Sequence, residues 1–115
     1  MKEKLLEILP EFNLIENADL REKTISVFKE AIKIGGWEID DLDKIPFTLL
    51  YEPCPASFLE HTRANVLCCL SIMEALKKVY KEKIKIDKDI LISGAILHDV
   101  GKLLEMEKKD GKVVK

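Results

Sequence analysis

The longest helical segment that the sequence predicts is residues 57–80, SFLEHTRANVLCCLSIMEALKKVY. Ser57 and Glu60 have the spacing of a capping box, in which each side chain hydrogen-bonds to the backbone N–H of the other residue. Residues 53–55, Pro-Cys-Pro, end whatever element precedes this helix. Few polar groups interrupt residues 64–75, so we expect neighbouring elements to surround the middle of the helix.

A second apolar segment, residues 90–97, lies beyond a short polar connection at residues 81–85. We expect its helix to begin at about Asp87, to run to about Val100 and to stop at Gly101. Because the connection is short, the two helices should pack as antiparallel neighbours. This packing would bring the end of the second helix close to the start of the first.

Two shorter helices are predicted before this pair, at residues 1–9 and residues 19–34. Pro10 ends or kinks the first helix, and Gly35-Gly36 stops the second. The apolar face of the second helix could pack on the central pair or form a dimer surface, and the sequence leaves both open.

Residues 37–51 have a weaker pattern. Asp40 could cap a short helix that ends before Pro46, and residues 47–51 could be extended or form one more helical turn. We interpret Trp37 as a core anchor rather than as a stacking platform for a ligand.

The last segment predicts a β-hairpin, because Asp110-Gly111 separates two short runs that contain apolar residues. The whole chain therefore predicts an all-α fold, a helical bundle with a short β-hairpin at the C-terminus. We expect one domain overall, with residues 1–51 as an N-terminal helical segment and residues 52–115 as the core that carries the site. The chain stops within the second predicted strand, so we expect it to be a fragment of a longer protein.

The composition favours a packed core under a solvated surface, since 47% of the residues are hydrophobic and 35% are charged. A formal net charge of −2 provides no overall field that attracts nucleic acid, although a local basic patch is compatible with it. No uncharged run approaches the roughly 20 residues of a membrane span. The three cysteines form no CxxC pair, so we expect reduced, buried residues of a cytoplasmic protein: Cys54, Cys68 and Cys69.

His98 and Asp99 directly follow the apolar run. An ionised carboxylate at the edge of a core is costly unless something pairs with it, and a divalent metal binds both carboxylate and imidazole. The other histidine, His61, lies in the first turns of the long helix, where antiparallel packing would bring it near. The residues alone also allow a simpler interpretation, in which the histidines belong to the core edge and Asp99 makes a cap or salt bridge.

Residues 58–62, FLEHT, and residues 95–102, AILHDVGK, resemble the HD-domain metal-dependent phosphohydrolase superfamily. The resemblance covers roughly residues 55–102. It implies an all-helical fold and a partial HD-like core that binds one divalent metal, which could be Mn, Fe, Ni, Co, Zn or Mg. The implied metal ligands are His61, His98 and Asp99.

The resemblance also implies that Asp99 and Lys102 are catalytic, with Lys102 near the substrate phosphate. The simpler interpretation of Lys102 is an exposed cation, which the dipole favours at a helix C-terminus. In the superfamily a further Asp downstream completes the coordination, and here Asp110 is the only Asp that follows Asp99. Because Asp110 lies in the predicted hairpin turn, we do not expect it to be a ligand. We therefore expect these 115 residues alone to hydrolyse phosphate esters poorly or not at all.

The function that the resemblance implies is a metal-dependent phosphohydrolase or phosphodiesterase that acts on a nucleotide or a related phosphate ester. Two alternatives stay open: an HD-type nuclease, since some HD proteins with a hairpin after this motif cleave RNA, and a non-catalytic sensory or scaffold domain. The expected partner is a small phosphate ester or nucleotide. Nucleic acid is less favoured, a membrane is not expected, and a homodimer is one arrangement that the sequence allows.

Overall fold

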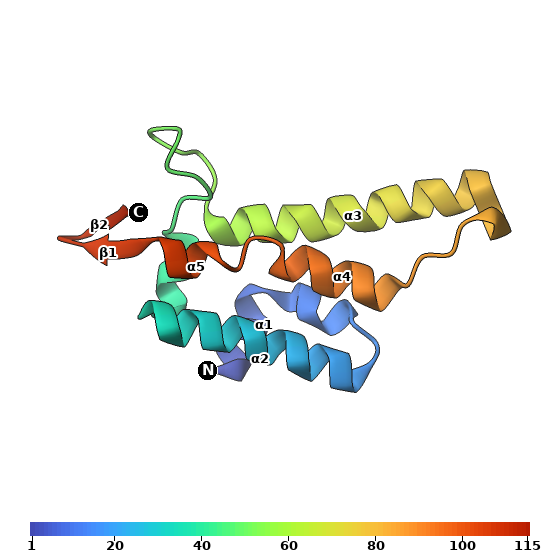
Figure 1. The fold of residues 1–115 in the computed structure, drawn as a ribbon, viewed down its shortest axis with the longest axis horizontal. Helices are drawn as coiled ribbons and strands as arrows, with labels where there is room; N and C mark the ends of the chain where they lie inside the picture. The colour runs from blue at the N-terminus through green and yellow to red at the C-terminus, as the bar shows by residue number, and fades with distance from the viewer.

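Two antiparallel helices, α3 (Phe58–Tyr80) and α4 (Lys88–Leu97), lie side by side, with α3 along one edge of the molecule and α4 in the middle (Figure 1). The computed structural model describes residues 1–115 and has extents of 53 × 31 × 20 Å. The predicted capping box is confirmed: Ser57 Oγ accepts from the Glu60 backbone N–H at 3.0 Å, and Glu60 Oε1 accepts from Ser57 N at 3.0 Å. The sequence therefore predicts the start of α3 correctly.

The N-terminal elements pack on the other side of α4, so that α4 lies between them and α3 (Figure 1). They are α1 (Lys2–Ile8), the 3₁₀ helix η1 (Pro10–Leu14) and α2 (Ala18–Gly35). Gly36 ends α2 in the left-handed conformation, at φ 73°, which confirms the predicted glycine stop. The N-terminal segment packs on the central pair, which is one of the two arrangements that the sequence left open.

The hydrophobic core joins residues from both halves of the chain. Three phenylalanines connect it: the rings of Phe12 and Phe28 meet edge to face at 5.7 Å, and those of Phe28 and Phe58 lie 6.1 Å apart. Trp37 is buried, and its indole N–H donates to the Leu103 carbonyl at 2.8 Å. The interpretation of Trp37 as a core anchor is confirmed.

The segment between α2 and α3 contains the 3₁₀ helix η2 (Ile39–Asp43) and then a loop. Pro46 and Ser57 form an isolated antiparallel bridge, so the chain leaves and re-enters the bundle at the same place. Residues 47–51 form neither a strand nor a helical turn. The loop they belong to stands beside the N-terminal end of α3 (Figure 1).

The predicted C-terminal hairpin is confirmed. Strands β1 (Glu107–Lys109) and β2 (Lys112–Val114) pair antiparallel across Asp110 and Gly111, whose φ angles are 51° and 79°. An isolated two-stranded hairpin is only marginally stable, so its contacts with the helices matter. Here Lys108 pairs with the buried Asp41 at 3.2 Å, and Val113 packs against the core.

The prediction for the end of the second long helix is wrong. α4 ends at Leu97 rather than at about Val100, and Gly101 does not stop a helix but precedes another one, α5 (Lys102–Glu105). Residues 98–101 form a tight turn, in which Val100 N donates to Leu97 O at 3.2 Å. Gly101 has ordinary right-handed angles, φ −60° and ψ −21°, so it lacks the left-handed geometry of a glycine helix stop.

The expectation that neighbours surround the middle of α3 is also wrong. Leu67 and Ile72 are 50% and 58% exposed, because α4 has 10 residues against the 23 of α3 and covers only one side of it. All three cysteines are free, but the prediction that they are buried is wrong, because Cys68 is exposed and Cys54 and Cys69 are only partly buried. No helix is both long enough and apolar enough to cross a membrane.

Phe28→Ala should destabilise the fold by about 3–5 kcal/mol, because it removes the ring that joins Phe12 to Phe58 and leaves a cavity. Urea denaturation followed by circular dichroism measures the change. Val27→Ala on the same helix, at a position 47% exposed, is the matched control and should change the free energy of unfolding by less than about 0.5 kcal/mol. Equal effects of the two substitutions would contradict the central role of Phe28.

Asp41→Asn should destabilise the protein near neutral pH by about 1 kcal/mol. The pKa of Asp41 is lowered, chiefly because its carboxylate accepts the Glu38 backbone N–H at 2.9 Å and also because Lys108 lies beside it. A lowered pKa means that ionised Asp41 stabilises the fold above its unfolded pKa of about 4, and that this stabilisation is lost as pH falls through the lower folded value. The gap between wild type and Asp41→Asn should therefore close in acid. Denaturation at about pH 7 and about pH 2 tests this, with Asp110→Asn, a change that the hairpin turn tolerates, as the control.

Candidate metal centre

Three side chains from two elements meet at the N-terminal end of α3. His61 lies in the first turn of α3, and His98 and Asp99 lie in the turn that follows α4. Asp99 Oδ2 is 2.9 Å from His98 Nε2 and 3.2 Å from His61 Nε2, and the two Nε2 atoms are 3.4 Å apart. The antiparallel contact of α3 and α4 thus produces the convergence that the sequence predicts.

The separations between these donor atoms suit a divalent cation. Metal–ligand distances of 2.0–2.2 Å in tetrahedral geometry place neighbouring ligand atoms about 3.3–3.6 Å apart, and octahedral geometry brings them to about 3 Å. Two imidazoles with one carboxylate are a common ligand set for Mn, Fe, Co, Ni or Zn. The side chains of His61, His98 and Asp99 are 34%, 31% and 25% exposed, so water or substrate can approach them. The residues present fit a divalent metal.

The hydrogen bond of the other His98 nitrogen makes this fit more specific. His98 Nδ1 lies 2.7 Å from the carbonyl oxygen of Ala95, and a carbonyl can only accept, so Nδ1 carries the proton. In the neutral ring, Nε2 then presents a lone pair to Asp99 Oδ2 and to His61 Nε2. Such lone pairs repel one another unless a proton or a cation lies between them. A metal ion satisfies all three atoms at once, and a backbone carbonyl behind a ligand histidine is typical of metal sites.

Lys102, the first residue of α5, stands at the edge of the cluster. Its Nζ is 3.5 Å from Asp99 Oδ2 and donates to the Phe47 carbonyl, and its side chain is 24% exposed. An ammonium group has three donors, so Lys102 can bind a further anionic group from this position. The structure therefore brings all four residues singled out in the sequence into one place.

Asp110 is not part of this group. It lies in the turn between β1 and β2, and the set of side chains arranged to hold a metal consists of His61, His98 and Asp99. A metal held here would therefore have three protein ligands, and its other coordination positions would be open to water or another small ligand.

Two residues that the sequence pattern did not suggest also belong to the site. The Phe47 ring stacks on the His61 ring, with centroids 4.8 Å apart and an angle of 14° between the planes, and Lys102 Nζ is 5.6 Å from the Phe47 centroid. Nothing in the sequence pairs Phe47 with His61, because the loop closed by Pro46 and Ser57 sets this contact. Asn65 lies one helical turn after His61, a spacing that could have indicated it, and its amide reaches the Ala95 carbonyl at 3.3 Å.

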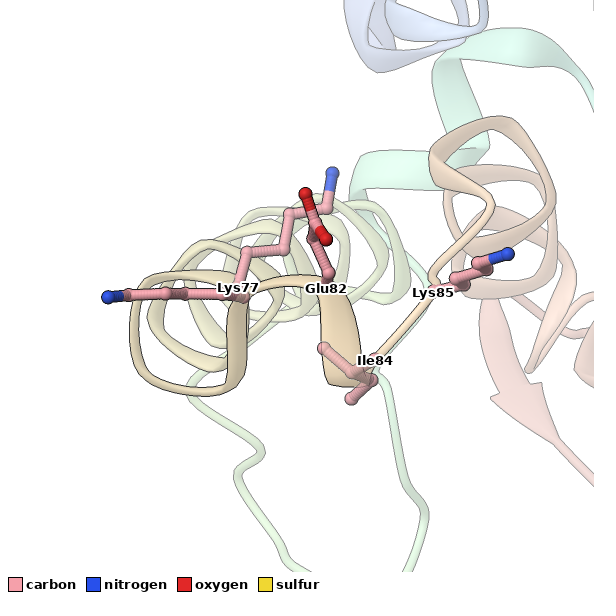
Figure 2. Close-up of a pocket in the computed structure, with 5 residues that line it drawn as sticks. Lys77, Glu82, Ile84 and Lys85 are labelled. Carbon is pink, nitrogen blue, oxygen red and sulfur yellow. The ribbon is translucent and has the colours of Figure 1, made fainter.

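A hollow of about 730 Å³ lies at the other end of α3 and has different chemistry (Figure 2). Lys77, Lys81, Glu82, Ile84 and Lys85 line it, and Glu82 is the one carboxylate among them. Sixteen residues of helix separate its first lining residue from His61, a rise of roughly 24 Å. With three lysines and a single carboxylate, this hollow is not a second metal site.

Comparisons with known proteins add no relative from which a role could be transferred. No family model, curated protein or solved structure matches this chain. The function must therefore be inferred from the donor atoms at the end of α3 and from the residues that hold them.

The structure predicts that the protein binds Mn²⁺ or Co²⁺ and that each ligand is needed. Replacing His61, His98 or Asp99 by alanine should weaken binding at least about 10–100-fold, because each change removes one of three protein donors. Isothermal titration calorimetry measures the affinities, and Asp110→Asn, outside the cluster, should leave them unchanged. Ligand variants that bind as tightly as wild type would rule out this metal centre.

Proposed function

We propose that this protein is a metal-dependent phosphohydrolase or phosphodiesterase that acts on a nucleotide or a related phosphate ester. The observation that carries the proposal is the cluster in which His98 Nε2, His61 Nε2 and Asp99 Oδ2 face one another while His98 Nδ1 is bound to the Ala95 carbonyl. The likeness of residues 95–102 to the HD-domain superfamily supports it, as does the all-helical fold.

His61, His98 and Asp99 would hold the metal. When bound, a divalent cation polarises a phosphoryl oxygen and lowers the pKa of a water molecule towards neutrality. Asp99 makes its contacts with both histidines and with Lys102 through Oδ2, so Oδ1 is available to accept a proton from the attacking water. Phe47 covers one face of the His61 ring and excludes water from that side.

Lys102 would bind the substrate phosphate. Its Nζ is held near Asp99 by the Phe47 carbonyl, which fixes the ammonium beside the cluster before any substrate arrives. From this position it can offset the negative charge that develops on the phosphoryl oxygens in the transition state. The same side chain therefore serves both substrate binding and the chemical step.

Two alternatives each depend on one observation. The β1–β2 hairpin, which follows the His-Asp-Val-Gly-Lys segment after the short helix α5, favours a nuclease. The presence of three rather than four protein ligands favours a non-catalytic sensory or scaffold domain that retains the metal. Both alternatives keep the metal centre, and they differ from the proposal in substrate or in turnover.

The proposal is tested by assaying the 115-residue chain with Mn²⁺ or Ni²⁺ against bis-p-nitrophenyl phosphate, p-nitrophenyl phosphate and a short single-stranded RNA. We expect slow turnover of the small esters, because three protein ligands hold the metal less firmly than four. Turnover should vanish with EDTA and in His98→Ala. Lys102→Ala should still bind metal but lower kcat/KM by about 10–100-fold, a loss of roughly 1.4–2.7 kcal/mol of transition-state stabilisation.

The outcomes of these assays distinguish the phosphohydrolase from the nuclease and from the scaffold domain. Cleavage of RNA alone would favour the nuclease, and metal binding with no turnover above His98→Ala would favour the scaffold. Turnover that is well above a buffer blank but equal in wild type and His98→Ala would contradict the site itself.

A further inference from the structure

The carbonyl of Ala95 receives two side chains, one from each of the helical segments that carry the metal ligands. His98 Nδ1 lies 2.7 Å from this oxygen, and Asn65 Nδ2 lies 3.3 Å from it, while Nδ2 and Nδ1 are 3.2 Å apart. Asn65 is half-buried on α3, one turn beyond His61. Asn65 therefore bridges the helix of one ligand to the backbone that holds another.

The chemistry of the carbonyl explains this arrangement. Ala95 lies in the last turn of α4, where backbone carbonyls have no partner within the helix. A carbonyl oxygen has two lone pairs, so it can accept from both Asn65 and His98. Reversing the Asn65 amide would place its own oxygen against the Ala95 oxygen, which two acceptors do not tolerate. The donor therefore faces Ala95.

We propose that Asn65 is a positioning residue: by donating to the Ala95 carbonyl it holds that oxygen where it receives His98 Nδ1–H, and so aims His98 Nε2 at His61 and Asp99. The role of Asn65 in metal binding rests on the proposed metal centre. The effect of Asn65 on the His98 ring does not rest on it, because Asn65 acts through the Ala95 carbonyl and His98 Nδ1, which is not the proposed metal donor.

The hydrogen bond to the Ala95 carbonyl decides which nitrogen of the neutral His98 ring carries the proton. With the Ala95 oxygen held in place, the proton stays on Nδ1 and Nε2 keeps the lone pair that a metal needs. When that oxygen is released, the 2.9 Å contact between Nε2 and Asp99 Oδ2 draws the proton to Nε2 instead. A neutral ring protonated at Nε2 must shift that proton to Nδ1 before Nε2 can bind a metal, and the cost of this shift weakens affinity.

Two measurements on Asn65→Ala test the proposal. In metal-free protein at about pH 8, ¹H–¹⁵N spectra of the imidazoles should show His98 mainly as the Nδ1–H tautomer in wild type and should shift towards Nε2–H in the variant. Affinity for Mn²⁺ by calorimetry should fall about 10-fold or more. Asn65→Gln keeps the amide donor and should recover part of both effects. Ser71→Ala, an exposed position on the same helix, is the matched control and should change neither.

The outcomes are distinct from those for the proposed function. If wild type binds no metal, the proposed function fails, yet the tautomer comparison still reports on Asn65. A lower melting temperature of Asn65→Ala with unchanged tautomer and unchanged metal affinity would show that Asn65 only supports the fold, and would overturn the proposal.

Discussion

The antiparallel contact between α3 and α4 is the constraint on which the rest of this structure depends. Buried residues on each helix, among them Val66 on α3 and Ile92 and Ile96 on α4, hold the two elements together within the common core. The contact sets the start of α3 against the end of α4, which are 37 residues apart at His61 and His98. Without it, two histidines and an aspartate would be scattered polar groups at the ends of separate helices.

The position at which α4 ends matters for the site, because α4 ends at Leu97, directly before His98 and Asp99. On a continuous helix, successive side chains point about 100° apart, so neighbours rarely face the same point. His98 keeps right-handed helical angles, φ −57° and ψ −33°, yet in the turn at residues 98–101 its Nε2 approaches Asp99 Oδ2 to 2.9 Å. The same turn leaves the Ala95 carbonyl without a helical partner, which makes it available to His98 Nδ1 and to Asn65. The end of α4 at Leu97 thus leaves unpaired the carbonyl that orients one of the proposed ligands.

A loop and a short helix complete the site from outside the central pair. Pro46 and Ser57 close the loop against the start of α3, and this closure puts the Phe47 ring on His61 and the Phe47 carbonyl on Lys102. Because α5 follows immediately after the turn, Lys102 lies next to Asp99. The candidate site therefore combines four segments, whose relative positions depend on the buried core around Phe28, Phe58 and Trp37.

The sequence alone determined the helical class, the capping box of α3, the glycine end of α2 and the Asp-Gly hairpin, because each depends on a few adjacent residues. The short connection between two antiparallel helices also indicated that His61 lies near His98 and Asp99, whereas Lys102 was indicated by the resemblance to the HD-domain superfamily. The sequence failed where distant segments decide the outcome: how far α4 extends, and which side of α3 stays exposed. Only the tertiary structure placed Phe47 and Asn65 at the site. Phe47 stacks on His61 and Asn65 binds the Ala95 carbonyl, and in both cases the partner lies in another element that only packing brings within reach.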